Sequence, residues 1–388
     1  MTSTRRQMLR STLALAGIAG SAGLGLAQWR EALAATTAGA GSYGALGEPD
    51  ANGVRLPAGF SARLVAVSGQ VVAGSSYAWH FQPDGGATFA LPGGGWAYAC
   101  NAELNGTAGG AGAIRFSASG EIVGAYPILS GTKYNCAGGP TPWGTWLSCE
   151  EFRNGRVWEC DPSRRSQGVV RPAMGLFAHE AAAVDPATGI VYLTEDDDTS
   201  RLYRFLPRAW GDLSGGRLEA ATVDAAGNVG WVPALDNKPY RGRESAVFAR
   251  GEGAWFAAGV LYFCTTTDNR VWALETASNR LSIVYDAAVA GPGAPLREPD
   301  NVTVHPTSGE IFVCEDDDNL ECVLLSPVHG GGRIAAPFLQ FIGHQGSEVA
   351  GAAFSPDGTR LYLASQRGIG RKYDSPGMTF EISGPFLR

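Results

Sequence analysis

Acidic residues recur at matching places in three segments of this chain. Glu180 precedes a short apolar run, a tight turn and a second run that ends at Glu195. Asp300 and Glu315 repeat this order at the same spacing, and Glu348 opens a third copy. Carboxylates held within about 5 Å of one another raise each other's pKa, and a bound cation is the usual way to keep them ionised. If the fold brings the three copies together, the pattern predicts a metal site.

Further acidic groups stand beside other predicted strands. They are Glu103, Glu150 with Glu151, Glu195 with Asp196, Asp197 and Asp198, Glu252, and Glu315 with Asp316, Asp317 and Asp318. An isolated Asp-rich run is most often a solvated turn, and the repeated position is what favours a shared metal role. The histidines show no ligand spacing, and we expect His179 to be packed rather than ligating. Carboxylate oxygens without imidazole favour calcium, magnesium, manganese or ferric iron, and a thiolate among them would favour iron.

The composition indicates which elements position these groups. The 388 residues include 54 Gly and 22 Pro, with only 17% charged and 10% aromatic residues. Many turns and large flat side chains suit short strands packed face to face better than long helices. Four-stranded blades of about 40 to 50 residues are typical of β-propellers, in which each innermost strand starts beside the axis. We therefore expect an all-β fold, a six-bladed β-propeller with a central metal-binding channel.

The N-terminal segment predicts an export signal. Thr4–Arg10 contains a twin-arginine pattern, and a short apolar stretch and a small-residue cleavage site follow it. We predict a signal peptide at residues 1–34, a Gly/Ala-rich linker at 35–60 and one propeller domain at 61–388. The expected export partner is the twin-arginine machinery, and the expected location is periplasmic or extracellular. The alternative, a membrane anchor, is disfavoured because the apolar run is short and Gly-rich for a span of about 20 residues.

The net charge argues against two classes of partner. Removal of the signal would take away four arginines and one glutamate, which lowers the net charge from −7 to −10. Nucleic acids and anionic membranes are bound through surplus Lys and Arg. We therefore expect neither a nucleic-acid partner nor stable membrane insertion, and we expect a monomer.

Seven cysteines remain after the predicted signal. The odd number leaves at least one thiol unpaired in a compartment that permits disulfides. Cys149 with Cys160, and Cys314 with Cys322, are close enough in sequence to be disulfide candidates. Twin-arginine export carries proteins that are already folded, so an unpaired thiolate that binds a metal fits this route.

One segment carries a long and distinctive motif. Tyr134–Glu151 reads YNCAGGPTPWGTWLSCEE, and it resembles the signature of the PhoX alkaline phosphatase family. Shorter motifs with the same resemblance are His179-Glu180-Ala181, Thr194-Glu195-Asp196, Gly251-Glu252-Gly253, Pro299-Asp300-Asn301, Cys314-Glu315-Asp316 and Ser347-Glu348. The long motif is also compatible with packing at a blade edge, in which case Cys136 is a small buried side chain.

The resemblance implies a secreted six-bladed propeller with a buried cluster of ferric iron and calcium. It also implies that the substrates are phosphate monoesters of small molecules, which the protein hydrolyses. The implied ligands are Cys136 for iron, Glu150 and Glu151 beside it, and Glu180, Glu252, Asp300 and Glu348. Weaker candidates are Glu103, Glu195, Asp196, Glu315 and Asp316.

Two departures from the family pattern bear on activity. Asn101-Ala102-Glu103 lacks a histidine that is common in the family, and Gly346 stands where the resemblance places a phosphate-binding arginine. A phosphoryl dianion needs cationic donors. The residues that we consider as replacements are Lys133, Arg153 and Arg367. Two alternatives therefore stay open: a metal-binding propeller without catalysis, and a calcium-dependent lactonase or other esterase, for which fold analogy is the argument.

Overall fold

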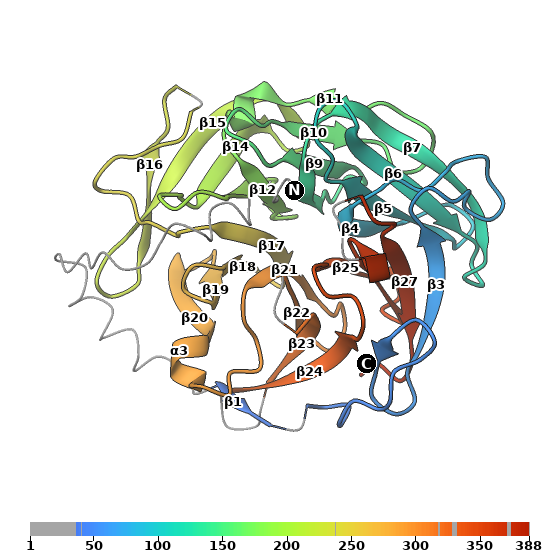
Figure 1. The fold of residues 1–388 in the computed structure, drawn as a ribbon. Coiled ribbons are helices and arrows are strands. Elements are labelled where there is room, and N and C mark those ends of the chain that lie inside the picture. Colours follow the sequence, from blue (N-terminus) through green and yellow to red (C-terminus); the bar gives the residue numbers. More distant parts are fainter. Residues whose placement is uncertain are drawn as a thin grey trace.

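The computed structural model describes residues 36–39, 41–236, 238–316, 319–327, 332–370 and 374–387. These residues form six sheets that are arranged as blades around one axis, and Figure 1 looks along it. The expected six-bladed β-propeller is confirmed. The predicted signal peptide at residues 1–34, and Asp317 with Asp318, lie outside the described residues. Within those residues, no helix has the length and apolar character needed to cross a membrane.

The blades follow one another along the chain, and each begins with its innermost strand. Blade 1 contains β4 (Pro83–Ala90), β5 (Trp96–Ala102), β6 (Gly109–Phe116) and β7 (Ile122–Thr132). Blade 2 contains β8 (Asn135–Pro140), β9 (Trp146–Glu150), β10 (Val157–Cys160) and β11 (Val169–Val170). Blade 3 contains β12 (His179–Val184), β13 (Val191–Glu195), β14 (Tyr203–Ala209), β15 (Asp212–Val223) and β16 (Val229–Pro233).

The second half of the ring repeats this order. Blade 4 contains β17 (Gly251–Ala257), β18 (Val260–Thr265), β19 (Arg270–Glu275) and β20 (Arg280–Asp286). Blade 5 contains β21 (Pro299–Val304), β22 (Ile311–Glu315), β23 (Glu321–Pro327) and β24 (Arg333–Phe341). Blade 6 contains β25 (Val349–Phe354), β26 (Arg360–Ser365), β27 (Met378–Ser383) and β3 (Ser61–Val67). The short helices are η2 (Pro172–Met174), α3 (Ala287–Ala290) and η3 (Gly368–Gly370).

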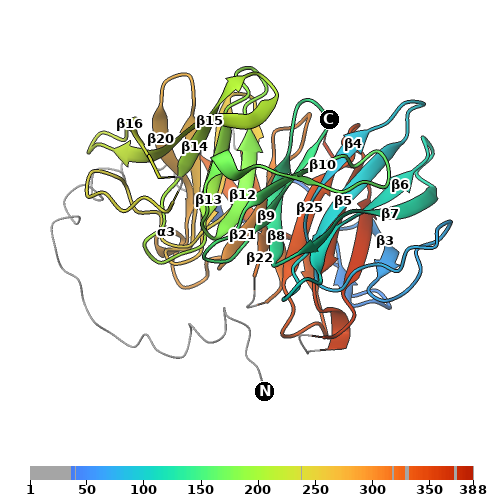
Figure 2. The ribbon, with the colours of Figure 1, turned by 90° about the horizontal axis from the view of Figure 1, so that it is seen from above.

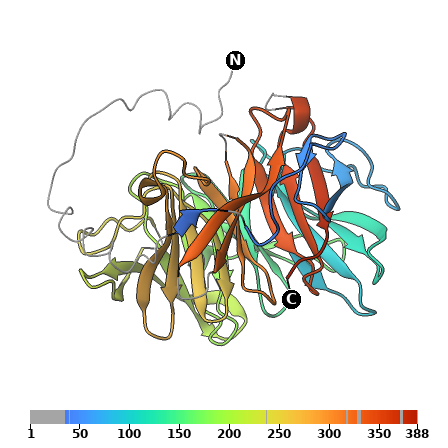
Figure 3. The same ribbon diagram turned by 90° about the horizontal axis from the view of Figure 1, so that it is seen from below.

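The ring closes because strands from the two ends of the chain pair with each other. β3 runs antiparallel to β27, and Figure 2 shows this blue strand beside the red one. The segment 35–60, predicted as a linker, also contributes strands. β1 (Thr36–Ala38) lies parallel to β24 and β2 (Val54–Arg55) lies antiparallel to it, so this part of the chain crosses the outside of blade 5 (Figure 3).

Apolar side chains fill the spaces between neighbouring blades, and the innermost strands approach one another more closely still. A Cβ atom at Gly139 would lie 1.6 Å from the carbonyl oxygen of Ala182, and one at Gly85 would lie 2.4 Å from the Cα of Ala137. Glycine is required at these positions because main chains of adjacent blades are nearly in contact. This close approach brings the starts of six strands to one axis.

All seven cysteines are buried and free in the structure, so neither candidate pair forms a disulfide there. Cys149 lies opposite Val157 in the β9–β10 pairing, and Cys160 lies opposite Trp146, so their side chains are not cross-strand neighbours. Cys314 and Cys322 do face each other across β22 and β23. Closeness in sequence indicated the second neighbour relation correctly, but not the first.

Candidate metal centre

Five innermost strands carry a candidate ligand on a β-bulge. In β4, β8, β12, β17 and β21 the pairing register shifts directly after the first residue of the strand. The first bulged positions are Asp84, Cys136, Glu180, Glu252 and Asp300. A bulge redirects a side chain that regular pleating would aim elsewhere. Five blades thus present a candidate ligand from the same backbone position.

A second set of side chains follows the second strand of each blade. These residues are Glu103, Glu151, Asp196, Thr266, Asp316 and Gln366. The backbone N–H of each donates, at 2.8 to 3.2 Å, to the carbonyl of the residue just before the innermost strand of its blade. Four of those carbonyl residues, Gln82, Tyr134, Arg250 and Glu298, adopt positive φ angles of 45° to 53°. Such conformations in non-glycine residues cluster at functional sites.

The two sets meet in four overlapping groups, in each of which the potential ligand atoms lie within 4.8 Å of one another. The groups are Cys136, Glu151 and Glu180; Glu180, Glu252 and Asp300; Asp300, Asp316 and Glu348; and Asp84, Glu103 and Glu348. Cys136 Sγ lies 3.0 Å from Glu180 Oε1 and 3.6 Å from Asp84 Oδ2, which joins the first group to the last. These nine residues form one continuous set, which we call the acidic ring.

The donor set of the acidic ring fits metal ions. Eight carboxylates and one thiol converge, and all of these residues are buried except Glu103 and Glu151, which are half-buried. Carboxylates at this spacing repel one another unless a cation lies among them. Calcium takes six to eight oxygen ligands, and a thiolate among oxygens suits iron better than calcium. The chemistry of the ring therefore accommodates the two ions that the sequence led us to expect.

The signature segment explains how the bulge at Cys136 is held. The amide nitrogen of Asn101 donates to the carbonyls of Cys136 and Ala137 at 3.2 and 2.7 Å. The amide oxygen of Asn101 accepts from the Trp146 indole at 2.9 Å and from the Ser148 hydroxyl at 2.7 Å. Asn101 and its four hydrogen-bond partners are all buried. The Asn101 side chain, which comes from blade 1, therefore holds the backbone at Cys136 in blade 2.

Three predicted ligands serve the loops of their blades instead of the ring. Glu150, Glu195 and Glu315 each end a second strand, and each carboxylate accepts the backbone N–H of the residue six positions later, at 3.0 to 3.4 Å. Burial raises the pKa of Glu150 above its usual value. The structure places none of these three in the four ligand groups found among the described residues.

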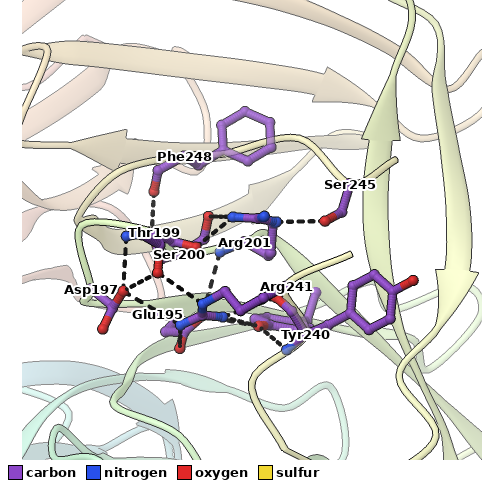
Figure 4. Close-up of polar contacts among 10 residues, drawn as sticks. Glu195, Asp197, Thr199, Ser200, Arg201, Tyr240, Arg241, Ser245 and Phe248 are labelled. Carbon is purple, nitrogen blue, oxygen red and sulfur yellow. Dashed lines mark hydrogen bonds and ion pairs between the residues drawn. The ribbon is translucent and has the colours of Figure 1, made fainter. Parts of the chain in front are cut away.

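Glu195 is the centre of a polar network that Figure 4 shows in close-up. Arg241 contacts its Oε1 at 2.7 Å, and the Tyr203 hydroxyl donates to its Oε2 at 2.9 Å. Arg241 also reaches Asp197, at 3.4 Å. Burial is the largest influence on Glu195 and raises its pKa, while Arg241 acts in the opposite direction. This carboxylate thus holds the loop after β16 against blade 3.

Asp196 lies next to the acidic ring but pairs with an arginine. Arg250 Nε is 2.8 Å from Asp196 Oδ1, and Arg250 Nη2 is 3.0 Å from Glu252 Oε1. The arginine therefore bridges one carboxylate of the ring and one beside it. His179 is packed, as expected: its ring lies 3.7 Å from that of Phe177, and burial lowers its pKa to about 3.

The sequence interpretation missed two members of the site. Asp84 follows Pro83 as Asp300 follows Pro299, and this shared Pro-Asp pair is the signal that would have found it. Gln366 occupies the second-strand position at which four other blades carry an acid. The sequence analysis also treated Glu348 as the counterpart of Glu180 and Asp300, and this was wrong. The hydrogen bond to its carbonyl aligns Glu348 with Ala178 and Glu298, which lie two residues before those positions.

The three cationic residues considered for phosphate binding lie in different environments. Lys133 sits over the rings of Tyr134 and Phe152 at 5.2 and 5.0 Å, and Arg153 is exposed. Arg367 is buried beside the ring, with Nη2 3.3 Å from Glu348 Oε2 and Nη1 3.4 Å from the carbonyl oxygen of Gly346. Arg367 therefore brings a guanidinium to the residue at which the resemblance places the missing arginine.

Solved structures share this fold. PhoX from Pseudomonas fluorescens, in complex with the transition-state analogue vanadate, matches with a TM-score of 0.66 and 16% sequence identity over 86% of this chain and 96% of that one. The gluconolactonase XC5397 from Xanthomonas campestris matches with a TM-score of 0.52 and 13% identity over 89% and 99%. No curated protein matches the chain.

The family comparison covers the segment that contains the signature. The model of the family described as alkaline phosphatase PhoX matches residues 96–158 and 152–282, which include Cys136, Glu151, Glu180 and Glu252 of the acidic ring. The remaining ring residues after 282 stand in motifs that resemble those of the same family. Over residues 96–282 the chain is therefore similar to the PhoX alkaline phosphatase family.

Proposed function

We propose that this protein is a metal-dependent phosphatase that hydrolyses phosphate monoesters outside the cytoplasm, with iron and calcium bound in the acidic ring. The observation that carries the proposal is the convergence of eight carboxylates and the Cys136 thiol at the propeller axis. Similarity to the PhoX family model over residues 96–282 supports the reaction type, and the predicted twin-arginine signal supports the location.

The ring residues suggest a division of labour between the ions. Cys136, Glu151 and Glu180 would hold iron, because this group contains the thiolate, and the all-oxygen groups would hold calcium. When bound, the ions supply Lewis-acid activation and neutralise the charge of the phosphoryl group.

The residues of the chain itself orient the substrate and shape its surroundings. Arg367 would donate to phosphoryl oxygens at the edge of the ring, since its guanidinium lies beside Glu348 and Gly346. Arg250 would keep Asp196 turned away from the substrate by pairing with it. Asn101 would hold the Cys136 bulge in place during turnover through its four buried hydrogen bonds.

A second candidate is a metal-binding propeller without catalysis. Gly346 in place of an arginine favours it, as do the ion pairs that join Arg250 and Arg367 to carboxylates of the ring. In that case the ions would close the channel and stabilise the fold.

Metal content and turnover of natively exported protein separate these functions. We expect iron and calcium by mass spectrometry, together with hydrolysis of p-nitrophenyl phosphate at alkaline pH with added calcium. Cys136→Ser should lose iron and activity together, whereas Cys160→Ser, a buried cysteine on the outer strand β10, should retain both. Metal without phosphatase or lactonase turnover would favour the second candidate, and no metal at all would refute both.

A further inference from the structure

Arg367, the cation that we place beside the substrate, is held by the segment directly before β25. Its backbone N–H donates to the Ser347 hydroxyl at 2.9 Å. Its guanidinium lies 3.4 Å from the Gly346 carbonyl oxygen and 3.3 Å from Glu348 Oε2. Both ends of the arginine thus depend on one short segment, and the hydroxyl fixes the backbone from which the side chain extends.

A turn in this segment explains why the guanidinium is not supplied from position 346 itself. The backbone N–H of Ser347 donates to the carbonyl of His344 at 3.0 Å, which closes a tight turn. Gly346, the third residue of this turn, has a φ of 83°. Such a left-handed conformation favours glycine and would strain an arginine. The cation instead comes from Arg367, just after β26, which reaches the carbonyl of Gly346 from outside the turn.

Behind Ser347 lies a chain of buried polar groups. Ser347 Oγ is 2.8 Å from Ser365 Oγ, and Ser365 Oγ is 2.8 Å from His344 Nδ1. His344 Nε2 lies 2.8 Å from the carbonyl oxygen of Asn52. The three side chains are all buried. The chain therefore connects Arg367 to the N-terminal segment that crosses the outside of blade 5.

The direction of each hydrogen in this chain is fixed from its far end. The Asn52 carbonyl only accepts, so His344 Nε2 carries a hydrogen. Burial lowers the pKa of His344, which keeps the ring neutral and leaves Nδ1 as an acceptor. Ser365 therefore donates to Nδ1, and Ser347 donates to Ser365 Oγ, which at 2.8 Å is closer than the Glu348 carbonyl oxygen at 3.3 Å. Ser347 consequently offers a lone pair to the backbone N–H that it contacts.

We propose that Ser347, with Ser365 and His344 behind it, is a positioning residue for substrate phosphate and acts through Arg367. The chain fixes the arginine backbone, so that the guanidinium stays turned toward the edge of the acidic ring. The inference rests on the part of the proposed function that assigns phosphate binding to Arg367, but it does not require turnover.

The experiment measures the binding of inorganic phosphate by calorimetry on metal-loaded, full-length mature protein, together with KM and kcat for p-nitrophenyl phosphate. Ser347→Ala removes the acceptor of the Arg367 N–H, and we expect phosphate binding to weaken and KM to rise by about three- to tenfold. The kcat and the metal content should stay unchanged. Ser347→Thr keeps a hydroxyl and should restore most of the loss.

Ser355 provides a matched control at the other end of β25. It is also buried, and its hydroxyl accepts the backbone N–H of another arginine, Arg360, at 3.0 Å and donates to Asp357 at 2.6 Å. Ser355→Ala therefore removes a similar set of hydrogen bonds. It should leave both phosphate binding and KM unchanged.

A double-mutant cycle tests whether the effect passes through Arg367. In an Arg367→Ala background, Ser347→Ala should weaken phosphate binding no further, because the guanidinium that it positions is gone. His344→Phe interrupts the chain at its far end and keeps an aromatic ring beside Phe341. It should show a smaller effect with the same dependence on Arg367, and it decides the question if Ser347→Ala does not fold.

Three results would overturn the inference. They are a parent protein that binds no phosphate, losses that add in the double-mutant cycle, and a Ser347→Ala variant that loses kcat and metal together at unchanged KM. In the last case the hydroxyl would serve the acidic ring through Glu348. Phosphate binding with the expected coupling but without turnover would refute the proposed phosphatase and leave the inference standing, whereas turnover without the coupling would do the reverse.

Discussion

Arg250 should matter much more to the metal-free protein than to the metal-loaded protein. Its side chain is 18% exposed and joins two carboxylates that are 10% and 1% exposed, Asp196 and Glu252. Removal of one partner from a buried ion pair generally costs about 3 to 5 kcal/mol, because a charge is left buried alone. Arg250→Met keeps most of the apolar stem and removes the charge, so we expect a loss of this size when no metal is bound.

Metal in the ring should reduce this loss. An ion that takes Glu252 as a ligand leaves only Asp196 without its partner, so the expected loss falls to about half, or roughly 2 kcal/mol. The assay is urea unfolding followed by tryptophan fluorescence, once with chelator and once with saturating calcium. Arg270→Met is the matched control, because Arg270 is 19% exposed and also pairs with two acids, Asp268 and Asp286, which lie outside the ring.

The control should lose the same stability in both conditions. Equal losses for Arg250→Met with and without metal would show that Glu252 is not taken over by an ion. The assignment of Glu252 to the ring would then be wrong, whatever the activity of the variant.

Three further predictions concern acid stability, substrate binding and the shared ligands. Burial lowers the pKa of His80 and His179 to about 3, so the unfolded chain binds more protons than the folded one below pH 6.5. Stability is therefore fully present above that pH and falls as the pH drops towards 3, by up to about 4 kcal/mol per histidine, and His179→Phe should move the acid-unfolding midpoint to lower pH. Arg367→Ala should raise the KM for p-nitrophenyl phosphate by about tenfold or more at unchanged metal content, and Arg367→Lys should restore part of the loss. Asp300→Asn should weaken two metal sites, because Asp300 belongs to two ligand groups, and should stabilise the metal-free protein by removing one of several repelling charges.

Each of these three has an outcome that contradicts it. An unchanged acid midpoint in His179→Phe would mean that the histidine is not buried in its neutral form. Arg153 is exposed, so Arg153→Ala serves as the comparison. If it raises the KM as much as Arg367→Ala does, Arg367 has no special role in substrate binding. Metal-free Asp300→Asn that is less stable than the parent would show that a hydrogen bond to this carboxylate outweighs the repulsion in the ring.

The sequence predicted the blades and pointed to most residues of the acidic ring because both depend on short-range patterns. Strand, turn and strand recur with an acid at the start, and the equal spacing of Glu180 to Glu195 and Asp300 to Glu315 reflects one pairing register, in which His179 lies opposite Glu195 and Pro299 opposite Glu315. Small residues on the innermost strands then fix how close the blades come. These features are local, and they survive without knowledge of the neighbouring blade.

The remaining features depend on directions that the sequence does not display. In each pair of acids at the end of a second strand, one carboxylate turns back to its own loop while the next faces the axis or its neighbour, as Glu315 and Asp316 show. Successive side chains of a strand point to opposite faces, so the direction of each carboxylate can be predicted only when the last residue of the strand is known. Asp84 was missed because the glycines after it lack the apolar character of the other innermost strands. Glu348 was misaligned because it also stands before an apolar strand, although its backbone position is two residues earlier than that of Glu180 and Asp300.

The closure of the ring by β3 and β27 also constrains when the site can exist. β3 is made early in synthesis and β27 is the last strand among the described residues, so blade 6 stays incomplete until nearly the whole chain is available. Glu348 and Gln366 belong to that last blade, and two of the four ligand groups contain Glu348. A partly synthesised chain therefore has no complete acidic ring, and metal selection is postponed to a finished molecule in the compartment where it folds. If the protein is exported after folding, as we propose, the choice of ion would be made by the supply inside the cell rather than by the medium outside.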